Sequence, residues 1–145
     1  MASQELIPLG LRSLKGELKY DFSLPIETPS NNFIKQAHFR DYRLVRKQFR
    51  ILIAREIADL NLEPPIERSF LVITRECAGG GLDWDNAYGG LKPLQDCLVK
   101  PSKRNPDGLG LIVDDNPQSM PYAPLLIQQS AKQQDGRTRV QIFQI

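Results

Sequence analysis

The stretch SFLVITREC, residues 69–77, decides the fold, because apolar and β-branched residues fill most of it. Such a run is typical of a strand buried in a sheet. The prolines of EPPIER, residues 63–68, end any helix before it, since consecutive prolines cannot continue a helix. The glycines of AGGG, residues 78–81, make a flexible connector after it. We therefore expect a buried strand with separate elements on either side.

A helix is expected upstream of this strand, from about His38 to Leu60. Apolar residues there recur at the spacing of one helical face, at Tyr42, Val45, Phe49, Leu52, Ile53 and Leu60. A cationic stripe on the same helix consists of Arg40, Arg43, Lys47 and Arg50. Residues 35–55 hold seven basic residues and one acidic residue, a net charge of +6, whereas the whole chain carries +2. This asymmetry suits a protein that grips a polyanion, although solvated basic faces are also common on surface helices.

Other patterns predict the remaining elements. Residues 16–26 alternate roughly between apolar and polar and predict a first strand, followed by a loop, ETPSNN, at 27–32. A second helix is expected within residues 86–99, beginning near Leu91, because Pro93 is tolerated in a first turn. A basic loop, KPSKRNPDGLG, follows at 100–110. Three more strands are then predicted at 109–115, 123–132 and 137–145, the last two joined by a turn containing Asp135 and Gly136.

The expected order is β-α-β-α-β-β-β, an α+β single domain with a mixed sheet and two main helices. At 145 residues the chain has the size of one domain, with residues 1–15 as an N-terminal arm before it. No apolar run approaches the length of a membrane span, so we expect a cytoplasmic protein without a membrane partner. Its two cysteines and one histidine fit no zinc pattern, and we expect both cysteines to be buried thiols.

Aspartates gather in GLDWDNAYGGLKPLQDCLV, residues 81–99. Asp83 and Asp85 are two apart, which in an extended segment directs both side chains to one face. A neighbouring position in the sheet would bring Asp114 or Asp115 across to them. Two carboxylates 4 Å apart repel by roughly 4 kcal/mol at an effective dielectric of 20, so such a cluster needs protons, water or a cation. Oxygen ligands of this kind suit Mg²⁺.

Lys92 supplies a positive charge beside these acids and would hold a phosphate or stabilise charge building up on it. Asp96 follows Lys92 by four residues, and a simple intrahelical ion pair is the plainer interpretation of that spacing. A calcium-binding EF-hand loop starting at Asp83 fails at three required positions. The sequence also has no Walker loop and no Gly-x-Ser-x-Gly nucleophile motif.

Several of these motifs, taken in order, resemble the RusA-type Holliday junction resolvases, which many phages and prophages carry. The resemblance covers residues 17–145 and rests on five segments: PSNN at 29–32, DWDN at 83–86, GLKPLQDCLV at 90–99, IVDD at 112–115, and the closing strand RVQIFQI. It implies a homodimeric, Mg²⁺-dependent endonuclease, with Mn²⁺ as a substitute, that resolves four-way DNA junctions by paired nicks. Its place would be recombination, repair or phage DNA processing.

The resemblance also implies roles for particular residues. Asp83, Asp85 and Asp115 would be the catalytic metal ligands, Lys92 the essential lysine, and Asp96 and Asp114 further candidate ligands. The expected DNA-binding residues are Asn31, Asn32, Lys35, Arg40, Arg43, Lys47, Arg50, Lys100, Lys103 and Arg104. Two departures stand out: CAGGG replaces the arginine run of some family members, and AYGGL lengthens the spacing to the lysine.

Two alternatives to a junction resolvase stay open. One is a DNA-binding protein of the same fold that binds branched DNA without cutting it. The other is a related nuclease that prefers flaps or replication forks, since the acidic residues alone do not select among branched substrates.

Overall fold

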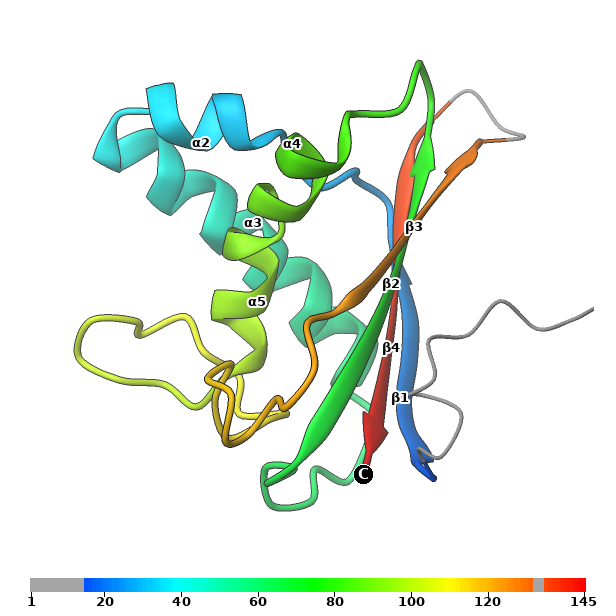
Figure 1. Ribbon diagram of the computed structural model, residues 1–145. Coiled ribbons are helices and arrows are strands. Elements are labelled where there is room, and N and C mark those ends of the chain that lie inside the picture. Colours follow the sequence, from blue (N-terminus) through cyan, green and yellow to red (C-terminus); the bar gives the residue numbers. More distant parts are fainter. Residues whose placement is uncertain (1–14, 132–134) are drawn as a thin grey trace, which may run out of the picture.

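The computed structural model describes residues 15–131 and 135–145, which form one sheet of four strands with all the described helices on one of its faces (Figure 1). The elements, in chain order, are β1 (Glu17–Leu24), α2 (Asn31–Gln36), α3 (Phe39–Ile57), β2 (Ser69–Cys77), α4 (Trp84–Gly89), α5 (Lys92–Leu98), β3 (Leu125–Ser130) and β4 (Arg137–Gln144). The α+β single-domain prediction is confirmed. The expected N-terminal arm lies outside the described residues, apart from Lys15. No helix in 15–131 or 135–145 has the length and apolar character to cross a bilayer.

The sheet order is β1-β4-β2-β3. β4 runs antiparallel to both β1 and β2, whereas β3 is parallel to β2. The prediction for β2 is confirmed to the residue. From Leu71 to Cys77 its residues alternate between buried and half-buried, because the helices cover one face of the sheet. The last two strands were expected to follow one another through a turn, but they flank β2 on opposite sides. Residues 132–134, within that connection, lie outside the described residues.

The predicted strand at 109–115 is wrong. The segment makes only an isolated bridge between Ile66 and Ile112. Its backbone amides instead donate to the end of α5, from Leu109 to the Cys97 carbonyl at 2.8 Å and from Leu111 to the Leu98 carbonyl at 2.9 Å. The last carbonyls of a helix lack partners within the helix, and this returning chain satisfies them. Gly110 adopts a φ of +74°, which favours glycine, at the point where the chain bends back.

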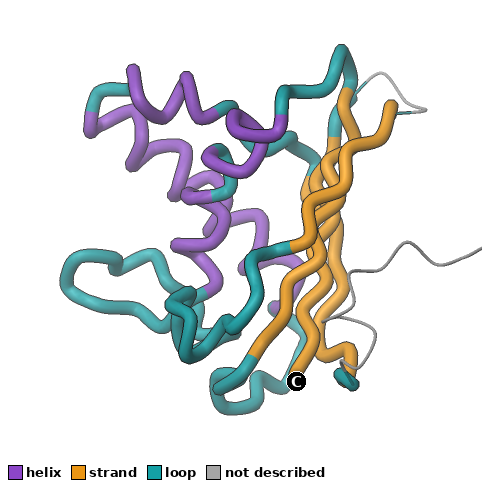
Figure 2. Tube along the Cα trace, in the orientation of Figure 1, coloured by secondary structure: helices purple, strands orange, loops and turns teal. Residues whose placement is uncertain are grey.

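Helix α3 packs on the sheet through Phe49, Ile53 and Ile57, all buried in a core shared with β2 and α5. The apolar stripe predicted from the sequence is therefore confirmed in its centre. Leu60 is an exception, since it lies beyond the end of α3 and is half exposed. The tube view shows the helical layer joined to the sheet by long loops at its lower end (Figure 2).

Two short helices were not predicted. α2 begins after Ser30, whose hydroxyl accepts a hydrogen bond from the Phe33 amide at 3.0 Å, a typical N-cap contact. α4 begins after Asp83, inside the stretch that was expected to be extended. The helix predicted to begin near Leu91 is α5, with Pro93 in its first turn as expected.

Candidate active site

The start of α4 carries Asp83 and Asp85, both exposed. The expectation that an extended segment directs them to one face is wrong, because Asp83 is the N-cap residue and Asp85 lies in the first helical turn. Residues two apart on a helix do not face each other. The Asp83 carboxylate instead accepts a hydrogen bond from Asn86 Nδ2 at 2.6 Å, one turn along α4.

The PSNN and DWDN motifs meet directly, although 54 residues separate them in the sequence. The backbone N–H of Asn32 donates to Asn86 Oδ1 at 3.2 Å, so Asn86 joins the start of α2 to Asp83. Gly90 permits this contact: a Cβ there would lie 1.7 Å from the Pro29 carbonyl oxygen. The segment AYGGL, residues 87–91, looked like an insertion in the sequence. Through Gly90 it packs directly against Pro29 of PSNN.

Helix α5 carries Lys92 and Asp96, whose Nζ and Oδ1 atoms lie 3.5 Å apart. The intrahelical ion pair, which was the alternative to a catalytic role for this spacing, is present. Asp96 has a second partner on α3, because the Tyr42 hydroxyl donates to its Oδ2 at 2.5 Å. Asn105 Nδ2 also donates to the Asp96 backbone carbonyl at 2.6 Å. Asp96 is thus held from α3 and from the loop after α5, as well as by Lys92 on its own helix, while the Lys92 side chain is largely exposed.

Asp114 and Asp115 follow the segment that caps α5, rather than ending a strand. Asp114 accepts hydrogen bonds from the Asp115 amide at 2.8 Å and from Asn116 Nδ2 at 2.9 Å. Desolvation of its carboxyl group raises the pKa of Asp115, and a hydrogen bond with Asp114 and the charges of Asp114 and Asp96 raise it further. Among these charges, that of Asp96 connects Asp115 electrostatically to α5.

Among residues 15–131 and 135–145, no three histidine, cysteine, aspartate or glutamate side chains converge closely enough to hold a metal ion. Asp83, Asp85 and Asp115 do not form a ready three-carboxylate site in this conformation. The donor chemistry nevertheless fits Mg²⁺, which takes one or two carboxylates and fills its remaining positions with water and substrate phosphate. The negative charge of Asp114 raises the pKa of Asp115, and a bound cation would offset this repulsion between like charges.

The candidate DNA-binding residues lie along the helical layer. Arg40, Arg43 and Lys47 on α3 are exposed, and Arg50 is half-buried. Asn32 and Lys35 on α2 are exposed. Asn31 is half-buried, because its side chain packs against the backbone of Gly89. The exposed cations of the loop after α5 are Lys100, Lys103 and Arg104. In Figure 1 this loop, in yellow, extends from the lower end of α5 away from the sheet.

Arg46 differs from its basic neighbours, because it is buried and paired. Its Nε lies 2.9 Å from Asp107 Oδ2, and both side chains are about nine-tenths shielded from solvent. The pair joins α3 to the basic loop. The charge count over 35–55 therefore overstates the positive charge that α3 presents to a ligand.

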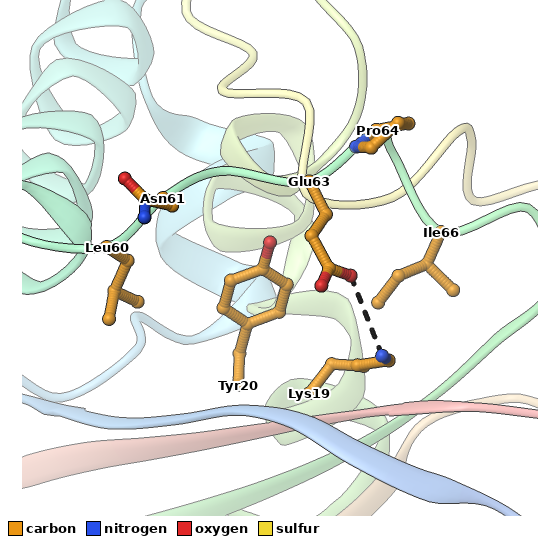
Figure 3. Close-up of a pocket in the computed structure, with 7 residues that line it drawn as sticks. All are labelled: Lys19, Tyr20, Leu60, Asn61, Glu63, Pro64 and Ile66. Carbon is orange, nitrogen blue, oxygen red and sulfur yellow. Dashed lines mark ion pairs between the residues drawn. The ribbon is translucent and has the colours of Figure 1, made fainter.

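A small concavity of about 150 Å³ lies between β1 and the connection from α3 to β2 (Figure 3). Its lining residues are Lys19, Tyr20, Leu60, Asn61, Glu63, Pro64 and Ile66. Lys19 Nζ lies 3.5 Å from Glu17 Oε1 and 3.6 Å from Glu63 Oε2, so its single positive charge is already paired with two carboxylates. None of the candidate site residues lines it.

Sequence reasoning gave no role to three polar residues that organise the site. Asn86 and Asn105 each donate a side-chain hydrogen bond to it, and Tyr42 was placed only in an apolar stripe. A tyrosine on the buried face of a helix needs a partner for its hydroxyl, which was the available signal for Tyr42.

No family model matches this sequence, and no curated protein matches it.

Proposed function

We propose that this protein is a Mg²⁺-dependent, structure-selective DNA endonuclease, which acts as a homodimer and resolves four-way junctions by paired nicks. The observation that carries the proposal is the hydrogen-bonded chain from Asn32 through Asn86 to Asp83. It brings two of the resemblance's motifs together beside exposed carboxylates. A twofold dimer suits the substrate, because a four-way junction needs two symmetric cuts.

One or two of Asp83, Asp85 and Asp115 would hold the metal, with water and substrate phosphate at its other positions. The metal would supply Lewis-acid charge to the scissile phosphate. Lys92 would place its ammonium against a non-bridging phosphate oxygen and stabilise the negative charge that develops there. In the overall hydrolysis, the oxygen of water bonds to phosphorus as one P–O bond to the sugar breaks. The leaving oxygen takes up a proton.

The exposed cations of α2, α3 and the loop after α5 would contact backbone phosphates of the DNA arms. Such contacts release counterions, so the proposal requires strong salt dependence. For about six neutralised phosphates, the slope of log affinity against log salt is near −5.

The test is cleavage of a synthetic four-way junction with Mg²⁺, comparing the wild type with Asp85→Asn. We expect the variant to lose at least about 100-fold in rate, because a candidate metal ligand loses its charge. Asp59→Asn, at an exposed position just after α3, is the matched control and should cut normally. If Asp85→Asn cuts as well as the wild type, the acidic-site assignment fails. A flap, a fork and a linear duplex assayed in parallel define the preferred substrate.

The absence of a three-carboxylate cluster within the described residues favours one second candidate, a protein that binds branched DNA without cutting it. Tight junction binding with no cleavage at any Mg²⁺ or Mn²⁺ concentration would support this alternative. Cleavage that Asp85→Asn abolishes would exclude it.

A further inference from the structure

Asp96 has a hydrogen-bonding or ionic partner for each oxygen of its carboxylate. Oδ2 accepts from the Tyr42 hydroxyl at 2.5 Å, and Oδ1 faces Lys92 Nζ at 3.5 Å. The side chain retains only 15% of its exposure. A carboxylate so engaged differs from the exposed Asp83 and Asp85 at the start of α4, whose positions are open to water and to an ion.

We propose that Tyr42 and Asp96 are positioning residues that orient the Lys92 ammonium, and that Asp96 is not a metal ligand. The consequence for cleavage rests on the function proposed above, whereas the orientation of Lys92 does not.

Asp96 is well placed to serve as a fixed acceptor. Its backbone carbonyl accepts from Asn105 Nδ2 at 2.6 Å, and its side chain is tied to α3 through Tyr42, 54 residues away in the sequence. A hydrogen bond to an ionised acceptor is roughly twice as strong as one between neutral groups. Burial first, then the hydrogen bond with Asp96 and its charge, raise the pKa of Tyr42 far above its usual range. The phenol therefore stays a donor throughout the physiological range.

Lys92 needs such support because its side chain is 62% exposed and has four rotatable bonds. Freezing a lysine side chain costs roughly 2 kcal/mol of rotamer entropy, and an exposed ion pair offsets little of that. An acceptor held in place by Tyr42 and Asn105 does not have to be ordered together with the lysine. The pair then restrains Lys92 more strongly than a pair between two mobile side chains would.

The same contacts connect Lys92 to the basic helix. Tyr42 lies next in sequence to the exposed Arg43, and its ring centroid is 5.9 Å from the Arg46 guanidinium. A phosphate backbone bound on α3 would therefore lie on the same element that anchors Asp96.

Side-chain NMR relaxation of Lys92, labelled at Cε, tests the positioning role without metal or DNA. We expect the Lys92 order parameter to fall by about one third in Tyr42→Phe and in Asp96→Asn. Tyr122→Phe is the matched control, because Tyr122 is exposed and packs edge-on against Phe70. Lys19, paired with Glu17 and Glu63, provides an internal reference that should not change. Unchanged Lys92 mobility in Tyr42→Phe would overturn the proposal.

Metal binding tests the second half of the proposal. Titration with Mn²⁺ should give a Kd for Asp96→Asn within about twofold of wild type, whereas Asp115→Asn should weaken binding about tenfold or more. Equal weakening in both variants would make Asp96 a ligand and overturn that half. Wild-type protein that binds no Mn²⁺ would contradict the proposed function, while the Lys92 measurement would still decide the positioning role.

Cleavage kinetics complete the test where the wild type is active. Tyr42→Phe should lower kcat about tenfold and leave KM for the junction within about twofold, because it misplaces a catalytic group without removing a DNA contact. The double variant Tyr42→Phe/Asp96→Asn should be no slower than Asp96→Asn alone, since both act through Lys92. If the rate losses of the two single variants add up in the double variant, Tyr42 and Asp96 do not act through the same residue, Lys92.

Discussion

Arg46 and Asp107 form an ion pair at 2.9 Å, shielded from solvent between α3 and the loop that follows α5. Arg46 belongs to a helix otherwise rich in exposed cations, and Asp107 belongs to a loop that carries three more. The pair therefore fixes the position of the basic loop against the basic helix. A ligand that contacts both the helix and the loop therefore depends on this ion pair to hold the two elements in place.

Asp107→Asn should lower the free energy of unfolding by about 3–5 kcal/mol, because it leaves the Arg46 charge buried without its partner. Urea denaturation measures the change. Lys103→Ala, at an exposed position of the same loop, is the control and should stay within about 0.5 kcal/mol of wild type. Replacing both partners, in Arg46→Met/Asp107→Leu, should recover much of the loss. A double variant less stable than Asp107→Asn would contradict this account.

The contact between PSNN and α4 depends on a missing side chain at Gly90. A Cβ there would lie 1.7 Å from the Pro29 carbonyl oxygen, which is backbone and moves only with the whole segment. Gly90→Ala should therefore cost about 1–3 kcal/mol, as overpacking does elsewhere. It should also weaken metal or DNA binding at the neighbouring acidic residues. Thermal unfolding together with the junction-binding assay measures both effects.

Gly80→Ala provides the comparison, since a Cβ at that position meets no atom within 4 Å. Alanine there restricts the unfolded chain, so the variant should be neutral or up to about 1 kcal/mol more stable. Equal destabilisation by both substitutions would show that close approach to Pro29 is not the cause.

The elements that the sequence predicted correctly are those with an intrinsic signal. β2 was located to the residue because its apolar run is long and sharply bounded, and α3 because Phe49 and Ile53 recur at helical spacing. The segment around Leu111 failed because its amides cap α5, a partner that no local pattern indicates. A strand ladder and a helix end compete for the same apolar segment, and tertiary contacts decide between them.

The site was predictable in part for the same reason. Asp83 followed by a short helix is an N-cap signal, but the two-residue spacing to Asp85 favoured an extended interpretation instead. The ion pair between Lys92 and Asp96 follows from helical spacing alone. The contact of Tyr42 with Asp96 joins residues 54 apart in the sequence, and only the packing of α3 against α5 brings it about.

Cys97 should be unreactive in the folded protein. Burial raises its pKa to about 12, and the charges of Asp107 and Asp96 contribute in the same direction. Because only the thiolate reacts, alkylation by iodoacetamide at pH 8 should proceed at the rate of global unfolding. A Cys77→Ser background isolates the signal from Cys97. Reaction as fast as in urea-unfolded protein would contradict the burial of this thiol.

The same shift predicts how stability depends on pH. The folded pKa of Cys97 is raised above the unfolded value of 9.0, so its contribution is fully present below pH 9 and is lost as pH rises toward 12. Cys97→Ala should therefore flatten the decline of unfolding free energy over that window. Parallel curves for the variant and the wild type would show that other groups, such as Tyr42, account for the decline.

Trp84 offers a direct optical probe of the acidic motif. It is the single tryptophan of the chain, it lies between Asp83 and Asp85, and it is 55% exposed. Its emission should resemble that of tryptophan in water, and acrylamide should quench it readily. Four-way junction DNA bound at the proposed site would cover the indole and reduce the quenching constant about twofold or more, since bases exposed at the branch point stack on aromatic rings. Linear duplex at equal occupancy should protect it less, because its bases stay stacked. If DNA binds and the quenching constant is unchanged, the DNA binds elsewhere on the protein, away from the acidic residues.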